Sequence, residues 1–387
     1  MTGSVQHVVV APDKFKGSLT AAEAAARIAS GNSAAAPGTT ISVIPVADGG
    51  EGTVLAAAAA GFDLVPVRAR GPSGQPVTGW LAVRDTVAVV EAAQVSGLQL
   101  VPPGSLAPLT ASSYGTGQLI AAAADLGCRE VILGLGGVAC TDGGAGLAQG
   151  LGALLLDERG QLLPPGGGSL AQLSQLDLDP LRARIAGVTF TAALDVDNPL
   201  LGPRGAAAVY GPQKGASPGD VALLDGALTH WADIVSGATE SDLRDVPGAG
   251  AAGGLGFGAL SLLNATARPG IALLLDLLGF ASALKDATLV VTGEGCLDQQ
   301  TLHGKAPAGV LAAATAAGVP VAAVAGRLDL TSAQWRAAGF AAAYALTDLA
   351  GDGVDPIAAA GPLAEQAGRL IAADFLSADR ATATPDR

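Results

Sequence analysis

Short runs of β-branched and apolar residues alternate with alanine-rich segments at both ends of the chain. Val8–Ala11 and Ile41–Val46 have the length and composition of buried strands. Each run leads into a Gly-containing loop and then into a segment of helical composition, Ala21–Ser30 after the first and the residues from Thr53 after the second. Repeated strand–loop–helix units predict parallel strands joined by crossover helices, with both loops at one edge of the sheet.

The pattern changes in the middle of the chain to short alternating runs separated by Gly/Pro turns, which is typical of antiparallel strands. These runs are Leu64–Val67, Gly79–Val83 and Val87–Glu91. We therefore expect an α/β protein with two domains. Residues 1–68 and 287–387 form a parallel three-layer, flavodoxin-like domain, and residues 69–286 form an inserted mixed-sheet α/β domain. After Leu376 we expect a frayed tail.

The stretch from Asp286 to Pro307 carries the most concentrated polar chemistry. Leu289–Thr292 predicts a buried strand that stops at Gly293-Glu294-Gly295. Two glycines around one carboxylate favour a sharp turn that holds the acid at the carboxyl end of the strand, where open α/β sheets bind their ligands. Asp298 and Lys305 follow shortly afterwards.

Composition and charge exclude several classes of protein. Among 387 residues, 50% are hydrophobic and only 3% aromatic, so the core must be built from small aliphatic side chains. A net charge of −13 argues against nucleic-acid or anionic-membrane partners. Three cysteines without CxxC spacing indicate neither a disulfide framework nor a zinc site, and they fit a cytoplasmic location. The first residues lack the pattern of a secretory leader.

Familiar nucleotide-binding motifs are missing or out of context. The segment Gly248–Gly253 matches GxGxxG, but no predicted strand precedes it, so close helix packing or a mobile loop is the better interpretation. The sequence contains neither a GxxxxGK[ST] motif nor the protein-kinase set. A nucleotide, if one binds, must be held in another way.

Lysines and acids gather in the loops that follow predicted strands. The chain has 5 lysines against 16 arginines, and four of the lysines lie in such loops: Lys14, Lys16, Lys214 and Lys305. The acids in these loops are Asp13, Asp48, Glu51, Asp142, Asp195, Asp197, Glu294 and Asp298. Singly, each is best explained as a solvated loop acid or helix cap. Together, compact cations and carboxylates with few histidines suit phosphates and Mg²⁺, and so predict phosphoryl transfer.

Several motifs in order resemble the bacterial type I glycerate kinase family (glycerate 2-kinase). The matching pieces are APDKFKGSLT, ADGGEGT, SSYGTGQLI, the GLGG…DGGAG loop, DVDNPLLGPRGAAAVYGPQKGA, GAGAAGGLGFG and TGEGCLDQQTLHGKAP. The resemblance implies two α/β domains with the active site in the cleft between them, and ATP with Mg²⁺ acting on D-glycerate to give 2-phosphoglycerate and ADP. Alternatives are a nucleotide-dependent dehydrogenase of a small hydroxy acid and a non-catalytic carboxylic-acid binding protein. A homodimer stays an open option.

Candidate site residues follow from the loops and the resemblance taken together. As catalytic residues we expect Asp195 or Asp48, as the base for the acceptor hydroxyl, and Lys16. For substrate or phosphate binding we expect Lys14, Ser18, Gly49, Gly50, Asn198, Lys214, Lys305, Thr292, Gly293 and Gly295. For Mg²⁺ we expect Asp13, Glu51, Glu294 and Asp298.

The chain also departs from the family pattern at several positions. Lys14 stands where the family commonly has serine, and Val138, Cys140 and Thr141 replace Ser, Thr and Asn. Cys296 replaces a common Arg or Ser. We hypothesise that Lys14 supplies the positive charge missing at position 296, so Lys14→Ser should lower turnover sharply, and an unchanged rate would refute the idea.

Overall fold

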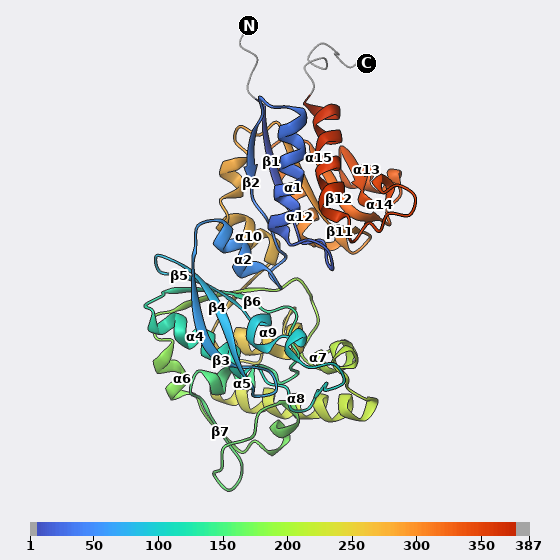
Figure 1. The fold of residues 1–387 in the computed structure, drawn as a ribbon. Coiled ribbons are helices and arrows are strands. Elements are labelled where there is room, and N and C mark those ends of the chain that lie inside the picture. The colour runs from blue at the N-terminus through green and yellow to red at the C-terminus, as the bar shows by residue number, and fades with distance from the viewer. Residues whose placement is uncertain (1–5, 377–387) are drawn as a thin grey trace. The chain divides into compact units, whose positions relative to one another are not determined.

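The chain divides into two compact units, and the structure, a computed structural model, describes residues 6–376 (Figure 1). We call Met1–Asp48 with Ile271–Arg387 the discontinuous unit and Gly49–Gly270 the continuous unit. The expectations for the start of the chain and for a tail after Leu376 concern residues 1–5 and 377–387, outside the described part. Among residues 6–376, no helix combines the length and the apolarity that crossing a bilayer requires.

The sheet of the discontinuous unit is parallel throughout. Its strand order is β2-β1-β11-β12-β13, and every neighbouring pair is parallel. This is the flavodoxin-like order, whose topological switch point lies between the first strand and the third in sequence. The strands are β1 His7–Pro12, β2 Thr40–Val43, β11 Leu289–Leu297, β12 Val321–Leu328 and β13 Ala342–Ala345. The predicted parallel, flavodoxin-like α/β architecture is confirmed.

Helices cover both faces of this sheet. On one face α1 Ala21–Ala35 packs against α15 Ala360–Phe375, and Ile28 and Ile371 share a core with Val8 and Val291 (Figure 1). Strand residues that alternate to the opposite face, such as Val290, are also fully buried, and α12 packs on β1, β11 and β12. The remaining helices are α10 Gly270–Leu277, which starts in the last residue of the continuous unit, α11 Phe280–Ala283, η4 Thr301–His303, α12 Ala306–Ala316, α13 Ser332–Ala338 and α14 Leu346–Leu349.

The continuous unit contains a mixed sheet of order β10-β9-β6-β5-β4-β3. The pairs β3/β4 and β4/β5 are antiparallel, and the other pairs are parallel. The strands are β3 Asp63–Arg70, β4 Pro76–Arg84, β5 Val87–Glu91, β6 Glu130–Gly134, β9 Thr189–Ala193 and β10 Thr266–Arg268, with a separate hairpin of β7 Leu154–Leu156 and β8 Gln175–Asp177. The predicted mixed sheet is thus confirmed.

Helices and turns of the continuous unit bury one large aliphatic core around Leu119, Leu133 and Trp231. Its helices are α2 Thr53–Ala59, α3 Ala93–Ser96, η1 Leu98–Leu100, α4 Tyr114–Asp125, α5 Ala145–Gly150, η2 Gly167–Gln172, α6 Asp179–Arg184, α7 Ala206–Tyr210, η3 Pro212–Lys214, α8 Pro218–Thr239 and α9 Ala251–Leu262. The division between the units falls at 48/49 and 270/271, before the expected limits at 68/69 and 286/287. It falls early because α2 packs on β4 and β5, and β3 joins the mixed sheet.

Candidate active-site residues in the two units

The switch point of the discontinuous unit brings two carboxylates together, one just after β1 and one within the neighbouring strand β11. β1 and β11 pair with Pro12 opposite Gly293, so Asp13 and Glu294 each follow this last matched pair. Asp13 N–H donates to the Gly293 carbonyl at 2.8 Å, and the Thr292 hydroxyl donates to the Ala11 carbonyl at 2.8 Å. Thr292 and Gly293 therefore hold the two chain segments together beneath the acids.

The expectation that the strand stops at Gly293-Glu294-Gly295 is wrong, because β11 continues to Leu297. Its pairing with β12 extends to Leu297 opposite Leu328. A Cβ on Gly293 would lie 1.9 Å from the Val324 carbonyl oxygen, so only glycine permits this close approach. Gly293 thus lets the strand stay paired with β12 instead of ending it.

Asp13 is a buried acid with neighbours of both charges. Its side chain is 8% exposed, and one carboxylate oxygen accepts the Lys14 N–H at 2.6 Å. Burial raises the pKa of Asp13 to about 7, the charge of Lys14 opposes the rise, and Asp48 and Glu294 add to it. Asp13, Asp48 and Glu294 are therefore electrostatically coupled within one unit.

Glu294 belongs to a compact acid–hydroxyl–lysine cluster. It is 8% exposed and accepts a hydrogen bond from the Thr301 hydroxyl, while Thr301 N–H donates to Asp298 at 3.0 Å. Lys305 Nζ lies 3.7 Å from Glu294 and 3.5 Å from Asp298. Burial raises the pKa of Glu294; burial would do the same for Asp298, but the Thr301 N–H and Lys305 together lower its pKa. Three of the predicted residues thus lie together.

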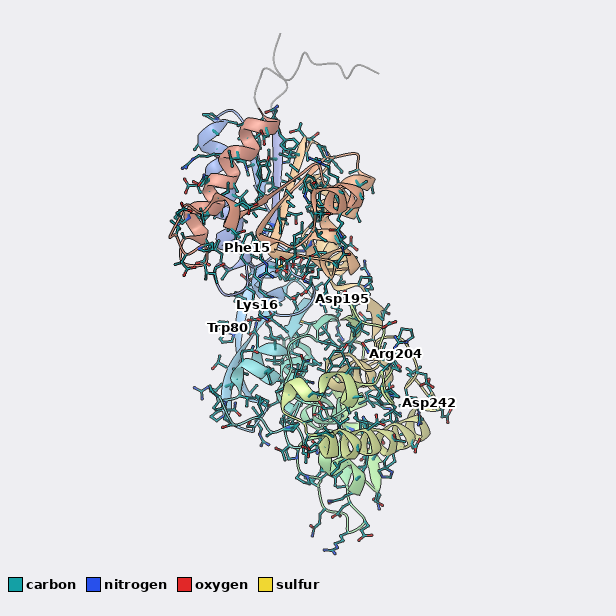
Figure 2. The ribbon with its side chains drawn as sticks, turned by 90° about the vertical axis from the view of Figure 1, so that its right-hand side faces the viewer. Phe15, Lys16, Trp80, Asp195, Arg204 and Asp242 are labelled. Atoms are coloured by element: carbon teal, nitrogen blue, oxygen red, sulfur yellow. The ribbon has the colours of Figure 1, made fainter. Side chains whose placement is uncertain are left out.

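A tight turn presents two further predicted residues (Figure 2). Phe15 is 1% exposed and anchors the turn, because its N–H donates to the Leu19 carbonyl at 2.8 Å. Lys16 and Ser18 are exposed, and the Ser18 hydroxyl donates to the Phe15 carbonyl at 3.0 Å. A Cβ on Gly295 would lie 3.1 Å from Lys16 N, so this turn packs on β11.

Cys296 has a cation beside it that the sequence did not reveal. Cys296 pairs with Arg327 across β11 and β12, and Arg327 Nη2 lies 3.7 Å from its sulfur. Arg327 also binds Asp329 at 2.8 Å, and the Cys296 thiol donates to Asp329 at 3.3 Å. A guanidinium therefore lies next to position 296, on the adjacent strand β12.

In the continuous unit, the loop at Gly49 lies against Asp195. Gly49 has φ of +84°, and a Cβ there would lie 2.5 Å from the Ala193 Cβ and 3.7 Å from Asp195 Oδ2. Asp195 follows the carboxyl end of β9, and its Oδ1 accepts the Gly270 N–H at 2.8 Å. Gly49 and Asp195 are thereby brought together, with Gly50 and Glu51 next in the loop.

Sequence analysis missed Glu91, which fixes the end of that loop. Glu91 ends β5, is 3% exposed, and accepts the Val54 N–H at the start of α2 at 3.1 Å. Burial raises its pKa, the hydrogen bonds from Val54 and Gly52 oppose the rise, and Glu51 adds to it. The signal was available, since Glu91 ends a predicted strand, but no glycine-rich turn surrounds it.

Asn198 is tied into its own loop. Its amide donates to the Arg204 carbonyl at 2.8 Å and its carbonyl oxygen accepts the Tyr210 hydroxyl at 2.7 Å. The neighbouring Asp197 forms an exposed ion pair with Arg204 at 3.1 Å (Figure 2 labels Arg204). These contacts order the loop that follows Asp195.

Lys214 is the most buried of the predicted cations, with 3% exposed. Its Nζ donates to the Cys140 carbonyl and lies 3.5 Å from the Thr141 hydroxyl. Burial lowers the pKa of Lys214, while Cys140 and Asp142 oppose that effect. Lys214 therefore contacts Cys140 and Thr141, two of the positions at which the chain departs from the family pattern.

Asp142 organises the same loop. It is fully buried and accepts the Ser113 N–H and hydroxyl at 2.8 and 2.9 Å, together with the Gly144 and Gly146 N–H groups at 3.2 and 3.3 Å. Burial raises the pKa of Asp142, and these donors oppose the rise. Asp142 is one of the loop acids that the sequence indicated, and in the structure it orders the backbone of its loop.

The GxGxxG-like segment, Gly248–Gly253, packs closely against neighbouring backbone. It follows no strand, and although α9 is assigned from Ala251, Ala252, Gly253 and Gly254 have left-handed φ/ψ, so the segment is a turn that leads into the helix. A Cβ on Gly253 would lie 2.1 Å from the Cys140 carbonyl oxygen, and one on Gly258 would lie 2.8 Å from Gly144 Cα. The segment is therefore closely packed, as one of the two interpretations expected, but it packs as a turn, and the helical glycine in close contact is Gly258.

Metal ligands were expected among Asp13, Glu51, Glu294 and Asp298. Within the described residues no group of three or more His, Cys, Asp or Glu side chains is arranged to hold a metal ion. Glu51 belongs to the continuous unit and the other three to the discontinuous unit. The acids that lie together therefore provide a few carboxylate oxygens but not a full set of protein ligands for a metal ion.

Comparison with known proteins places this geometry in a family. The profile of the Glycerate kinase family matches residues 8–376. The protein named glycerate kinase from Bacillus subtilis strain 168 is 46% identical over 328 residues, 84% of this chain and 86% of its own. The protein named glycerate 2-kinase from Escherichia coli K12 is 43% identical over 325 residues, 83% of this chain and 85% of its own.

A solved structure agrees with these matches. The crystal structure of a glycerate kinase 2 candidate from Salmonella typhimurium LT2 superposes with a TM-score of 0.86 at 38% identity, covering 97% of this chain and 100% of that one. The chain therefore belongs to the glycerate kinase family.

Proposed function

We propose that the protein transfers the γ-phosphoryl group of ATP to the 2-hydroxyl of D-glycerate, giving 2-phosphoglycerate and ADP. The observation that carries the proposal is the identity of 43–46% to proteins named glycerate kinase and glycerate 2-kinase, over more than four-fifths of the chain. The family profile, which matches residues 8–376, includes both sets of candidate residues. The 2-position rests on the name of the Escherichia coli relative.

A carboxylate takes the proton of the acceptor hydroxyl in this proposal. Asp195 is the first choice because the Gly270 N–H fixes one of its oxygens at the carboxyl end of β9. Asp48, coupled to Asp13, is the second choice. The hydroxyl oxygen forms a bond to the γ-phosphorus as the bond from that phosphorus to the β-phosphate oxygen breaks, and ADP carries away the leaving oxygen.

Lysines would neutralise the anionic groups of the two substrates. Lys305 has a side chain 32% exposed and is already poised by Glu294 and Asp298, so its ammonium keeps a fixed position. Lys16, on the turn after β1, and Lys14 beside Asp13 are the other candidates, with Ser18 and the glycines at 49, 50, 293 and 295 allowing close backbone approach.

Mg²⁺ fits the carboxylates of the discontinuous unit. Asp13 follows β1 and Glu294 lies on the adjacent strand β11. Burial disfavours the ionised forms of both, and repulsion between carboxylates adds to this effect. A divalent cation would offset that repulsion, and Mg²⁺ in nucleotide sites commonly takes one or two carboxylates with waters and phosphate oxygens. Asp13 and Glu294 would hold it, with Asp298 through water. When bound, the ion neutralises charge on the phosphate oxygens.

A coupled assay for ADP release tests the activity. We expect turnover with ATP, Mg²⁺ and D-glycerate, and ³¹P NMR of the product should show 2-phosphoglycerate and not the 3-isomer. The absence of ADP release with D-glycerate, tartronate and glycolate would overturn the kinase proposal. Titration of the metal-free protein with Mg²⁺ tests the cofactor separately.

Location and assembly complete the proposal. We propose a cytoplasmic enzyme, since its substrates would be charged metabolites, and a homodimer as one assembly to be tested. Light scattering after size-exclusion chromatography should give twice the mass of one chain. A mass of one chain would remove the homodimer from the proposal.

A further inference from the structure

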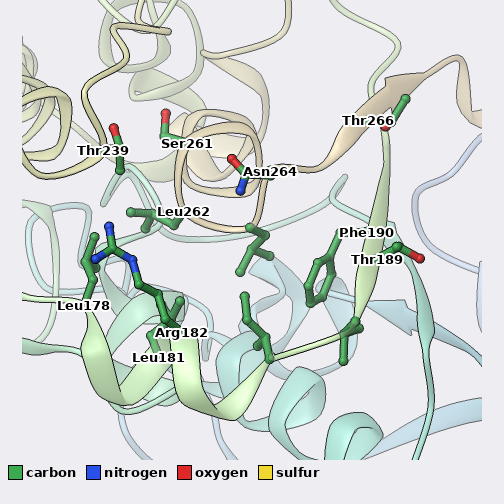
Figure 3. A pocket seen from close by; sticks show the side chains of 13 residues that line it. Leu178, Leu181, Arg182, Thr189, Phe190, Thr239, Ser261, Leu262, Asn264 and Thr266 are labelled. Atoms are coloured by element: carbon green, nitrogen blue, oxygen red, sulfur yellow. The ribbon is translucent and has the colours of Figure 1, made fainter.

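The continuous unit contains a cavity of about 470 Å³ at the amino ends of two neighbouring strands (Figure 3). Thr189 begins β9 and Thr266 begins β10, and both line the cavity. Asp195 and Gly270 follow the carboxyl ends of the same two strands. The cavity therefore lies at the opposite edge of the sheet from the candidate base, and its volume suits a small organic molecule.

Polar and apolar side chains both line the cavity, and the apolar ones form one part of its wall. Leu178, Phe190 and Leu263 line it, and their side chains are 5%, 4% and 4% exposed (Figure 3 labels the first two). They come from the residue before α6, from β9 and from the end of α9. Because these elements belong to the packed core, the apolar surface is preformed and would contact the apolar part of a ligand.

A buried hydroxyl without a partner also lines the cavity. Ser261 is 5% exposed, and its Oγ has no hydrogen-bond partner among the described residues. Buried polar atoms are almost always paired, so an unpaired one beside a cavity indicates that a further polar group belongs there. Asn264, at the same wall, has φ of 50°, a conformation that few non-glycine residues adopt.

Arg182 contributes the only charge among the described residues that line the cavity. Its Nη2 donates to the Ala238 carbonyl at 3.0 Å, and its Nη1 lies 3.7 Å from Asp179. The two side chains of this ion pair are 54% and 88% exposed, so the pair is weak. A guanidinium has five N–H donors, and a second acceptor can therefore join it.

The helix ends nearby do not reverse this positive character. α8 and α9 both end at the cavity, and helix C-termini carry partial negative charge of about half an elementary charge each. Arg182 already caps the carbonyl of Ala238, in the last turn of α8. The full charge of Arg182 and the absence of acids among the described lining residues therefore favour a ligand with an anionic end.

We propose that this cavity binds a small carboxylate with an apolar body. The carboxylate lies on Arg182, where it displaces the weak contact with Asp179, and accepts from the Ser261 hydroxyl and the Asn264 amide. The body packs on Leu178, Phe190 and Leu263. This site is separate from the candidate active-site residues, and its existence does not depend on the proposed activity.

Hexanoate is a suitable probe, with hexan-1-ol and hexylammonium as matched controls. In calorimetric titrations we expect saturable hexanoate binding that is about tenfold weaker in Arg182→Gln. Arg184→Gln is the control, because Arg184 lies on the same helix, pairs with Asp125 and does not line the cavity. Backbone NMR shifts should move around Thr189 and Leu263. Equal affinity in Arg182→Gln, stronger binding of hexylammonium, or shifts confined to other regions would overturn the proposal.

Ser261→Ala gives a second, independent test. Removing an unpaired buried hydroxyl should raise the melting temperature of the ligand-free protein, while hexanoate affinity should fall severalfold because an acceptor loses its donor. A hydroxyl that serves the fold alone would give a lower melting temperature and unchanged affinity. That pair of results would refute the assignment even where Arg182→Gln is too unstable to measure.

Discussion

Gly270 donates its backbone N–H to Oδ1 of Asp195 over 2.8 Å, and this bond joins the segments that follow two neighbouring parallel strands. The bond fixes the carboxylate at the sheet edge where α/β proteins bind ligands. Gly49 completes the arrangement, since any side chain there would collide with Ala193. Asp195 is therefore held in one orientation by groups that the sequence places far apart.

Replacement of this carboxylate tests its role as the base. An asparagine at position 195 keeps an oxygen that can accept the Gly270 N–H, so Asp195→Asn should fold normally. Loss of the proton acceptor should lower kcat by about 10²- to 10⁴-fold, with a much smaller change in KM. Steady-state kinetics with D-glycerate and ATP measure both parameters.

Two companion variants decide the assignment. Asp197→Asn removes a neighbouring acid whose pair with Arg204 is exposed, and it should leave kcat within a few-fold of the parent. Asp48→Asn addresses the second choice. A large loss in Asp48→Asn together with a normal rate in Asp195→Asn would transfer the role to Asp48.

Asp13 should make the free energy of unfolding depend on pH in the metal-free protein. Its pKa is about 7 in the folded state against 3.8 ordinarily, so between these values the folded state holds a proton that the unfolded chain has lost. Stability therefore falls as pH rises through this window, by about 4 kcal/mol at most. Asp13→Asn should remove the share of this loss that comes from Asp13 and should be more stable than the parent at pH 8, while Glu91, Asp142 and Glu294, whose pKa values are also raised, still contribute. Urea unfolding at pH 5 and pH 8 in EDTA measures it.

Asp352→Asn is the control for this experiment, since Asp352 is an exposed acid of the same unit. It should leave the difference between pH 5 and pH 8 unchanged. If Asp13→Asn loses as much stability as the parent between the two pH values, Asp13 is not the group responsible.

The strand and helix pattern was readable from the sequence because its signals are local. Val8–Ala11 and Leu289–Thr292 are short β-branched runs, and they form β1 and β11. The end of β11 was not readable, since whether Gly293 turns or continues depends on how closely Val324 approaches. Val324 lies on β12, a different strand of the sheet, so the residues next to Gly293 in the sequence do not indicate how close it comes.

The candidate residues show the same limit. Asp13 and Glu294 were found because each follows a predicted strand, and the pairing of β1 with β11 places them side by side. Glu91 also ends a strand, but its partner is the backbone N–H of Val54 at the start of α2. Every residue except proline has such a group, so the sequence does not indicate this contact. The cation beside Cys296 is Arg327 on the next strand. Which residue lies opposite Cys296 depends on the register of the two strands and not on spacing along the chain.

Glu91 should contribute strongly to the stability of the continuous unit. Glu91→Ala removes the acceptor of the Val54 N–H and leaves that group buried, which should cost about 2 kcal/mol. Glu91→Gln keeps an oxygen acceptor and should cost less. Urea unfolding followed by tryptophan fluorescence in a Trp335→Phe background reports on this unit, because Trp80 and Trp231 belong to it.

Glu130→Ala is the matched control, since Glu130 begins the neighbouring strand and is exposed. It should unfold within about 0.5 kcal/mol of the parent. A Glu91→Ala protein as stable as this control would show that the Val54 contact does not anchor α2.

Lys214 distinguishes a residue that binds phosphate from one that orders a loop. Its Nζ donates to the Cys140 carbonyl inside the core, so Lys214→Met should lower the free energy of unfolding by about 1–3 kcal/mol. The surface variant Lys285→Met should leave it unchanged. If Lys214 acts through the loop of residues 140–144, kcat should fall while the KM for ATP stays within a few-fold. A direct phosphate contact predicts the reverse, a large rise in KM with little loss of stability, so denaturation and kinetics on this one variant decide between the two roles.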